Sequence, residues 1–420
     1  MTTLREHFEI PKRYNTWSVG LMAVGALCVI ILFITHGSKA DPHIQARFWA
    51  SLLQNSLYFL LVTNACMFFI CATTLAWGGW QITFRRVSEA ITTATPVIGV
   101  ISIIIMLILV FGNNHIIYQW ADPENVRQSH ALQSKSPFLN KGFFTVWTFV
   151  IVGLWYVIGS RMRRLSRSID DRPLTVEEAK RFTWTSTVWA ALFLVVFALS
   201  VMSTIPWLWL MSIDAHWYST MYSWYTWAST FVPGCALIAI FIIYLKNKGY
   251  LELTNDEHLH DLGKFMFAFS IFWTYLWFSQ YMLIWYSNQP EETIYFITRF
   301  GTRNTPSPYR GIFFLNLIIN FVAPILILMR RGSKRNYTTM TFMCVLLIFG
   351  HWLDFFQMVF PGPLKDPVTG QTHVPFMLFD FGIGLGFVGL IMFITGRSLS
   401  RYPLIIKYHP FLKESIIHHT

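Results

Sequence analysis

The residues with the clearest chemical potential lie in the apolar segment 338–358. His351 and Asp354 are three positions apart and so share one face of a helix, and Gln357 extends that face by one turn. Asp354 is close to the C-terminal end of this segment, which the charge distribution described below assigns to the outer side. We therefore expect it to lie at a shallow depth in the membrane. Ionisable groups within membrane helices mark proton or substrate sites. We therefore predict that these residues transfer protons or face a quinone, with a structural His–Asp pair as the alternative.

Polar groups in neighbouring apolar segments form a second set of candidates. Asn316 and Asn320 lie one turn apart on one helix face, and Gln280 and Tyr281 lie within the charge-free segment 265–286. Such groups most often hydrogen-bond between membrane helices. We expect Gln280, Asn316 and Asn320 to face the interiors of helix bundles, where interhelical hydrogen bonding and a hydrated proton path are the two alternatives.

Four further candidates for a proton path lie near the ends of predicted membrane segments. Asp214 and His216, on the outer side, either mirror the His–Asp pair or belong to a helix cap beside an aromatic belt. Asp380 lies in the first turn of the last segment, near the outer side, and Glu89 precedes the third segment on the cytoplasmic side.

Two adjacent carboxylates, Glu291 and Glu292, follow segment 265–286 on the outer side. This pair either releases protons or forms ion pairs with Arg299 and Arg303. Ion pairing is the favoured interpretation.

The segments that carry these residues are membrane spans by composition. Hydrophobic residues make up 54% of the chain and charged residues 13%, whereas soluble domains have about 25% charged residues. Apolar runs long enough to cross a bilayer occur at residues 17–35, 50–77, 96–112, 143–160, 185–209, 222–245, 265–286, 309–329, 338–358 and 377–396. We predict an all-α polytopic membrane protein with about ten transmembrane helices.

The Lys and Arg residues predict the orientation of these helices. Most of the 32 lie at the N-terminus, in every second loop and in the C-terminal tail. By the positive-inside rule both termini are cytoplasmic. These loop cations also explain the net charge of +11 better than nucleic-acid binding does. The first apolar run is a spanning helix in this scheme, so we expect no cleavable signal peptide.

Loop lengths and even helix counts suggest how the single membrane domain is organised. We expect two four-helix bundles with two peripheral helices. The expected regions are an N-terminal segment with helix one (1–45), the first bundle (46–210), the second bundle (211–360), and helix ten with the cytoplasmic tail (361–420).

Proline and glycine add local predictions. Pro233 and Pro324 each remove a helical hydrogen bond, so we expect kinks there. Gly382 and Gly386, one turn apart, favour close contact with another helix.

Residue types and spacings give no sign of a bound cofactor or metal. The five cysteines lie within predicted spans and form no CxxC or CxxCH motif. Only His351 is deep in a span, so paired histidine ligands for haem are not expected.

Three stretches carry a family resemblance: FWTYLWFSQYMLIWYSNQPEETIYF at 272–296, HWYST at 216–220 and HWLDFF at 351–356. The chain resembles the F subunit of bacterial alternative complex III, a quinol:electron-acceptor oxidoreductase, over nearly its whole length. That family belongs to the wider NrfD/polysulfide-reductase type of membrane subunit.

The resemblance implies a multi-pass subunit of the bacterial inner membrane without redox cofactors of its own. The implied partners are a sister quinol-binding membrane subunit, an iron–sulfur subunit, and multihaem and monohaem cytochrome c subunits, together with lipids. The iron–sulfur clusters and haem c then lie in those partners. The implied role is support of electron transfer from quinol to cytochrome c or a terminal oxidase, with proton translocation.

Two alternatives remain beside this energy-coupling role. In the first, the chain is itself the quinol-binding catalytic subunit and uses His351 and Asp354. In the second, it is a stand-alone secondary transporter with a substrate site at the kinked helices.

Overall fold

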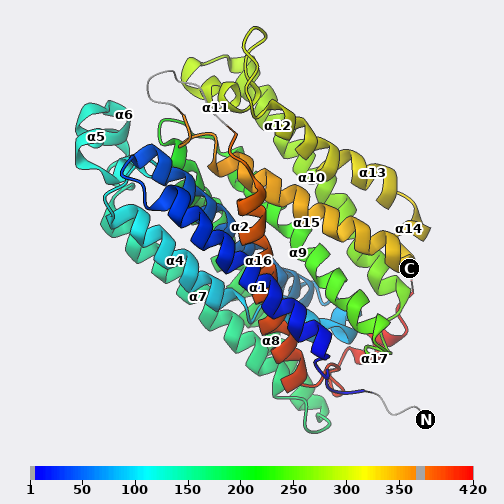
Figure 1. Cartoon of the computed structure of the whole chain (residues 1–420). Coiled ribbons are helices and arrows are strands. Elements are labelled where there is room, and N and C mark those ends of the chain that lie inside the picture. The colour runs from blue at the N-terminus through cyan, green and yellow to red at the C-terminus, as the bar shows by residue number, and fades with distance from the viewer. Residues whose placement is uncertain (1–4, 366–373, 420) are drawn as a thin grey trace.

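The computed structural model describes residues 5–365 and 374–419, which fold into helices joined by turns and short loops (Figure 1). The elements are α1 (Lys12–Leu32), η1 (Phe33–Gly37), α2 (Pro42–Leu75), η2 (Gly79–Thr83), α3 (Arg85–Ile91), α4 (Thr95–Phe111), η3 (Gln119–Ala121), α5 (Pro123–Gln128), α6 (His130–Lys135), α7 (Lys141–Arg167), α8 (Val176–Leu199), η4 (Ser200–Leu210), η5 (Met211–Asp214), α9 (Met221–Asn247), α10 (Asp256–Ser287), α11 (Pro290–Phe300), α12 (Arg310–Leu317), η6 (Ile318–Val322), α13 (Ala323–Leu328), α14 (Arg331–Arg335), α15 (Tyr337–Val359), α16 (Leu378–Arg401) and α17 (Leu412–Ile416).

Nine helical stretches of the described chain are long and apolar enough to cross a membrane. They agree with nine of the ten predicted segments, so the chain is a polytopic, all-helical membrane protein. The remaining segment forms most of α10, a helix of 32 residues. It is outside the set of nine because its Trp, Tyr and Ser residues, together with Gln280, lower its mean hydropathy.

Helix α2 is the centre of the packing. It contacts α4 and α8 on one side and α9, α15 and α16 on the others. Helices α4, α7 and α8 pack in sequence next to it, while α9 packs against α10 and α15. Most of α2 belongs to the predicted first bundle (46–210), and α2 also contacts α9 and α15 of the predicted second bundle (211–360). The division into two bundles therefore stays a prediction.

Small residues allow α1 to lie along α16, as Figure 1 shows. A Cβ atom added to Gly25 would lie 2.4 Å from the Cα atom of Gly386, and one on Gly382 would lie 2.3 Å from the Cys28 sulfur. The close helix contact predicted from Gly382 and Gly386 is thus confirmed, with α1 as the partner.

The predicted proline sites differ in their local structure. Helix α9 continues through Pro233 as one element. Before Pro324, in contrast, residues Ile318–Val322 form a π-helix, η6, which contains Asn320. Another π-helix, η4, contains Pro206. Wider turns of this kind occur frequently at functional sites.

Both ends of the described chain lie at the same end of the helix array. The Leu404 amide donates to the Glu6 carbonyl at 2.7 Å, and Arg5 reaches the carbonyl of Lys248. The loops rich in Lys and Arg gather here, so we call it the basic end. Helices α5, α6 and α11 lie at the opposite end (Figure 1).

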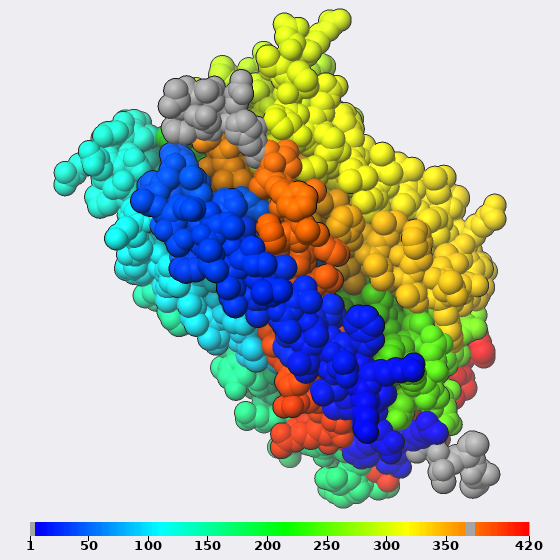
Figure 2. Space-filling model, in the orientation of Figure 1, coloured from blue at the N-terminus to red at the C-terminus, as the bar shows by residue number. Residues whose placement is uncertain are grey.

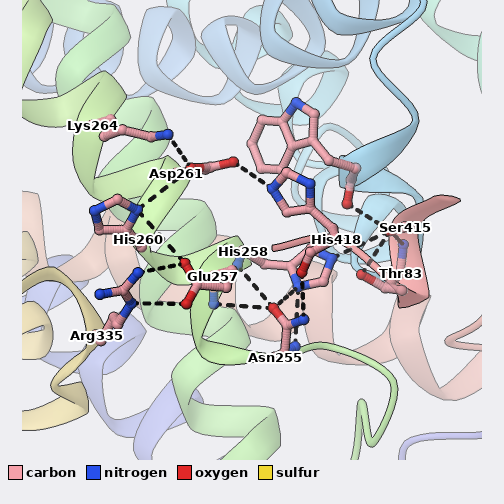
Figure 3. A network of polar contacts seen from close by, with 11 residues as sticks. Thr83, Asn255, Glu257, His258, His260, Asp261, Lys264, Arg335, Ser415 and His418 are labelled. Atoms are coloured by element: carbon pink, nitrogen blue, oxygen red, sulfur yellow. Dashed lines mark hydrogen bonds and ion pairs between the residues drawn. The ribbon is translucent and has the colours of Figure 1, made fainter. Parts of the chain in front are cut away.

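A polar network holds the C-terminal tail against the basic end (Figure 3). His418 lies 2.7 Å from the Asp261 carboxylate, which also contacts Lys264 at 2.5 Å. His258 is fully buried beside His418. The pKa of His258 is lowered to about 4, chiefly because the imidazole is buried and next because His418 lies nearby. The hydroxyl of Ser415 donates to the Trp80 carbonyl at 2.6 Å. These contacts tie α17 to η2 and α10.

Candidate functional site

Asp354 on α15 is fully buried and accepts four hydrogen bonds from three other elements. On α9, Ser229 donates at 2.7 Å and Tyr225, one turn earlier, donates through its hydroxyl. Trp273 on α10 donates through its indole nitrogen at 2.9 Å, and Asn316 on α12 donates at 2.7 Å. All four donors are uncharged, and among the described residues the carboxylate has no direct cationic partner.

His351, one turn before Asp354, joins this group through Ser229. Its Nδ1 atom lies 3.2 Å from the Ser229 hydroxyl oxygen, and the Trp273 ring packs edge-on against the imidazole. Because the single hydroxyl hydrogen of Ser229 is donated to Asp354, His351 Nδ1 is the donor in this contact. Its Nε2 atom is then a buried acceptor, and it has no hydrogen-bond partner in the described part of the chain.

The two asparagines extend the group along α12 and η6. Asn320 donates to the Asn316 side-chain oxygen at 2.5 Å, and both side chains are buried. Helix α15 can approach Asn320 closely because position 350 is glycine. A Cβ atom on Gly350 would lie 2.1 Å from the Asn320 Oδ1 atom. The inward orientation predicted for the asparagines is confirmed.

A small polar cavity of about 20 Å³ lies on the other side of Asp354. Gln280 and Gln357 line it, and the Gln280 Nε2 and Gln357 Oε1 atoms lack partners among the described residues. A cavity of this size has room for about one water molecule. A water there could satisfy both amides and contact Asp354.

Arg299 closes the cavity toward the end opposite the basic end. Its Nε atom donates to the Gln357 carbonyl at 2.7 Å, and its Nη2 atom forms an ion pair of 3.2 Å with Asp214. The guanidinium lies 3.4 Å from the centre of the Tyr295 ring, which stacks on Trp217. The Asp214 side chain is 23% exposed, so polar groups continue from Asp354 to the surface.

The remaining outer candidates lie away from this line. His216 and Glu291 are exposed, and Glu292 accepts a hydrogen bond from Ser287 at 3.2 Å. The favoured pairing of the two glutamates with Arg299 is wrong, because Asp214 takes that guanidinium. In the described chain, neither glutamate forms an ion pair with Arg303. Tyr281 packs edge-on against Phe296 and does not line the cavity.

Asp380 belongs to a separate buried cluster. Its carboxylate forms an ion pair of 2.5 Å with Arg47 and accepts a hydrogen bond from Ser51. Asn55 donates to the Asp380 carbonyl and accepts from the indole nitrogen of Trp352 at 2.8 Å. The cluster therefore contacts α15 through Trp352, two residues before Asp354.

Glu89 lies near the basic end, in α3. It is buried between Arg85 at 3.0 Å and Arg86 at 2.9 Å, and Arg86 also pairs with Asp170. Burial, the largest influence, raises the pKa of Asp170 in spite of this arginine. No contact of Glu89 in the described chain leads toward Asp354.

Three members of the site were not predicted from the sequence: Tyr225, Ser229 and Trp273. The one available signal was the spacing of Tyr225 and Ser229, whose hydroxyls recur one turn apart in a helix that must be buried. Nothing in the sequence distinguished Trp273 from the other tryptophans of α10.

The described residues contain no group of three or more His, Cys, Asp or Glu side chains that could hold a metal ion. Comparison with protein-family models and with curated proteins gives no match.

Proposed function

We propose that this chain is a cofactor-free membrane subunit of a quinol:electron-acceptor oxidoreductase and that it carries protons by way of Asp354. The observation that carries the proposal is the environment of this carboxylate. Four neutral donors hold it, and a cavity with room for one water adjoins it. The membership in a quinol oxidoreductase rests on the resemblance of the three sequence stretches.

The chemistry of a proton relay follows from these contacts. Hydrogen bonds stabilise the charged carboxylate, whereas desolvation favours its neutral form. A small movement of one donor, or the arrival of one water, changes this balance. On one side, the Ser229 hydroxyl links Asp354 to His351, whose free Nε2 atom can accept a proton. On the other side, the cavity leads to Arg299 and Asp214.

The same geometry gives less support to quinol oxidation at His351 and Asp354. A quinol ring needs far more room than the one water that the cavity holds. We therefore place quinol chemistry in a partner subunit. If the chain alone, without partners, is stable and transports a solute, both subunit proposals fail in favour of a secondary transporter.

The test replaces Asp354 with Asn in the assembled complex and measures quinol oxidation and proton release together. We expect oxidation to continue while proton release per electron decreases. A loss of both oxidation and quinol affinity would instead indicate a quinol site, and no change in either would make the group structural. Glu292→Gln, at the same end but outside the cavity, is the matched control.

A further inference from the structure

A long apolar groove lies between α16 on one side and α9 and α15 on the other, with α2 as its floor. Its volume is about 480 Å³, within the range of roughly 300–1,000 Å³ for ligand pockets. Its lining is almost entirely carbon, from side chains such as Phe59, Phe241, Phe349 and Val388. Figure 2 shows the face that carries α1, with parts of α16, α15 and α9 beside it.

The length of the groove matches the thickness of one leaflet of a bilayer. Along α16 it extends from Phe381 to Met392, which is about 16 Å at about 1.5 Å per residue. Half of a hydrocarbon core of about 30 Å is about 15 Å. The groove is therefore about as long as one acyl chain in a leaflet, and it ends at Phe381, one turn from the start of α16.

The end of the groove that lies away from the basic end, here called the inner end, suits the methyl terminus of a hydrocarbon chain and not a polar group. Phe349, Trp352 and Phe381 line it there. The indole nitrogen of Trp352 is already bound to Asn55 at 2.8 Å, so it offers no donor to a ligand. The polar groups around Asp354 face α9, α10 and α12 instead.

The mouth of the groove lies at the basic end and carries positive charge. Tyr14 and Tyr244 line this part, and the Tyr14 hydroxyl is bound to the Met392 carbonyl at 2.7 Å. Within about one turn of these tyrosines along the chain, Lys12, Arg13 and Lys248 are exposed. Glu9 is the exposed carboxylate nearest to Tyr14 in the sequence. Exposed cations at a membrane surface attract anionic phospholipids.

We propose that this groove binds one acyl chain of an anionic phospholipid, with the phosphate beside Lys12 and Arg13. The length of about 16 Å, the carbon lining and the cationic mouth each fit this occupant. A quinone ring would need hydrogen-bond partners, which the inner end does not offer. The proposal is independent of the proposed proton transfer.

The test uses the purified full-length protein in lipid nanodiscs that contain a photoactivatable phosphatidylglycerol with a diazirine near the end of one acyl chain. We expect labelled peptides from Phe349–Trp352 and Phe381–Val388. Phosphatidylcholine with the same chain should label them severalfold less. Replacing Lys12 and Arg13 with Gln should lower phosphatidylglycerol labelling by about fivefold per cation.

A variant that fills the groove tests the site itself. Val388→Phe should lower labelling severalfold, whereas Val195→Phe, the same change on the exposed side of α8, should leave it unchanged. Equal labelling by both phospholipids, unaffected by Val388→Phe, would mean ordinary surrounding lipid and would overturn the proposal. Displacement of the label by a quinone with an isoprenoid tail, or by a helix of another protein, would also overturn it.

Discussion

Two buried carboxylates in this chain have different kinds of partner. Asp354 and Asp380 are both fully buried. Asp380 faces the guanidinium of Arg47 at 2.5 Å, whereas Asp354 faces a tyrosine, a serine, a tryptophan and an asparagine. Asp380 has a permanent cation as its partner, whereas Asp354 has only neutral donors.

The difference separates a fixed charge from an exchangeable one. A carboxylate paired with arginine stays ionised, because arginine does not lose its proton in proteins. A carboxylate held by neutral donors can gain a proton without leaving a buried cation unpaired. We therefore expect Asp380 to stabilise the contact between α2 and α16, and Asp354 to change its protonation state.

The largest effect on stability is expected for Asp380→Asn, which leaves the buried Arg47 cation without its counterion. Breaking such a pair costs about 3–5 kcal/mol of unfolding free energy. Thermal denaturation of the detergent-solubilised protein measures the loss. Asp171→Asn, in an exposed loop, is the control, and the double variant Arg47→Met with Asp380→Leu should recover much of the loss. Unchanged stability of Asp380→Asn would show that the ion pair is not fixed.

Trp273→Phe removes one of the four donors to Asp354 and keeps an aromatic ring in place. A hydrogen bond to a charged group contributes about 1.5–3 kcal/mol, so we expect a loss in that range. The same denaturation measurement applies. Trp285→Phe, which changes a tryptophan that is 65% exposed on the same helix, should have little effect. If the two variants behave alike, the Trp273 bond to Asp354 contributes nothing.

Gly350→Ala tests the close approach of α15 to Asn320. The added methyl would lie 2.1 Å from the Asn320 oxygen, and overpacking of this kind costs about 1–3 kcal/mol. It should also disturb the Asn320–Asn316–Asp354 chain and lower proton release. Gly153→Ala, on α7, meets no atom within 4 Å and should be neutral or slightly stabilising. A fully active and stable Gly350→Ala variant would contradict the observed packing.

The smallest effect is expected at the basic end, in the pH dependence of the docked tail. The pKa of His258 is lowered to about 4 from 6.5, so the folded state binds this proton less readily than the unfolded state does. The free energy of unfolding is therefore not reduced by His258 above pH 6.5, and it decreases as the pH falls from 6.5 toward 4. His418 and Asp261 are the titratable groups beside it.

A spin label at Ile417→Cys, an exposed position, measures the mobility of this tail. We expect mobility to increase between pH 6.5 and 4, and His258→Gln to weaken that change. His419→Gln, at an exposed histidine, should leave it unaltered. A response that depends on His419 and not on His258 would contradict the assignment.

Local spacing predicted part of the site from the sequence. Two pairs, His351 with Asp354 and Asn316 with Asn320, each follow from helical periodicity within their own segment, because residues three or four positions apart share a face. The donors on α9 and α10 depend on which faces of distant helices meet. Tyr225 is 129 positions from Asp354, and no periodicity specifies that contact.

The same limit explains the wrong and the missing assignments elsewhere. Arg47 and Asp380 are 333 positions apart, so their ion pair could not be inferred from either segment. Arg299 was paired with its sequence neighbours Glu291 and Glu292, whereas the fold brings Asp214 to it. The spans themselves were predicted well because hydropathy is a local property, and α10 departs from the rest because aromatic and polar residues dilute it.

The most direct test of the central claim is infrared difference spectroscopy of the complete protein in a lipid film during a pH change. We predict a carbonyl band from a protonated, buried carboxylic acid that disappears in Asp354→Asn and persists in the Arg47→Met, Asp380→Leu double variant. A band that survives in Asp354→Asn but is lost in the double variant would contradict the assignment, because Asp380 would then be the exchanging group.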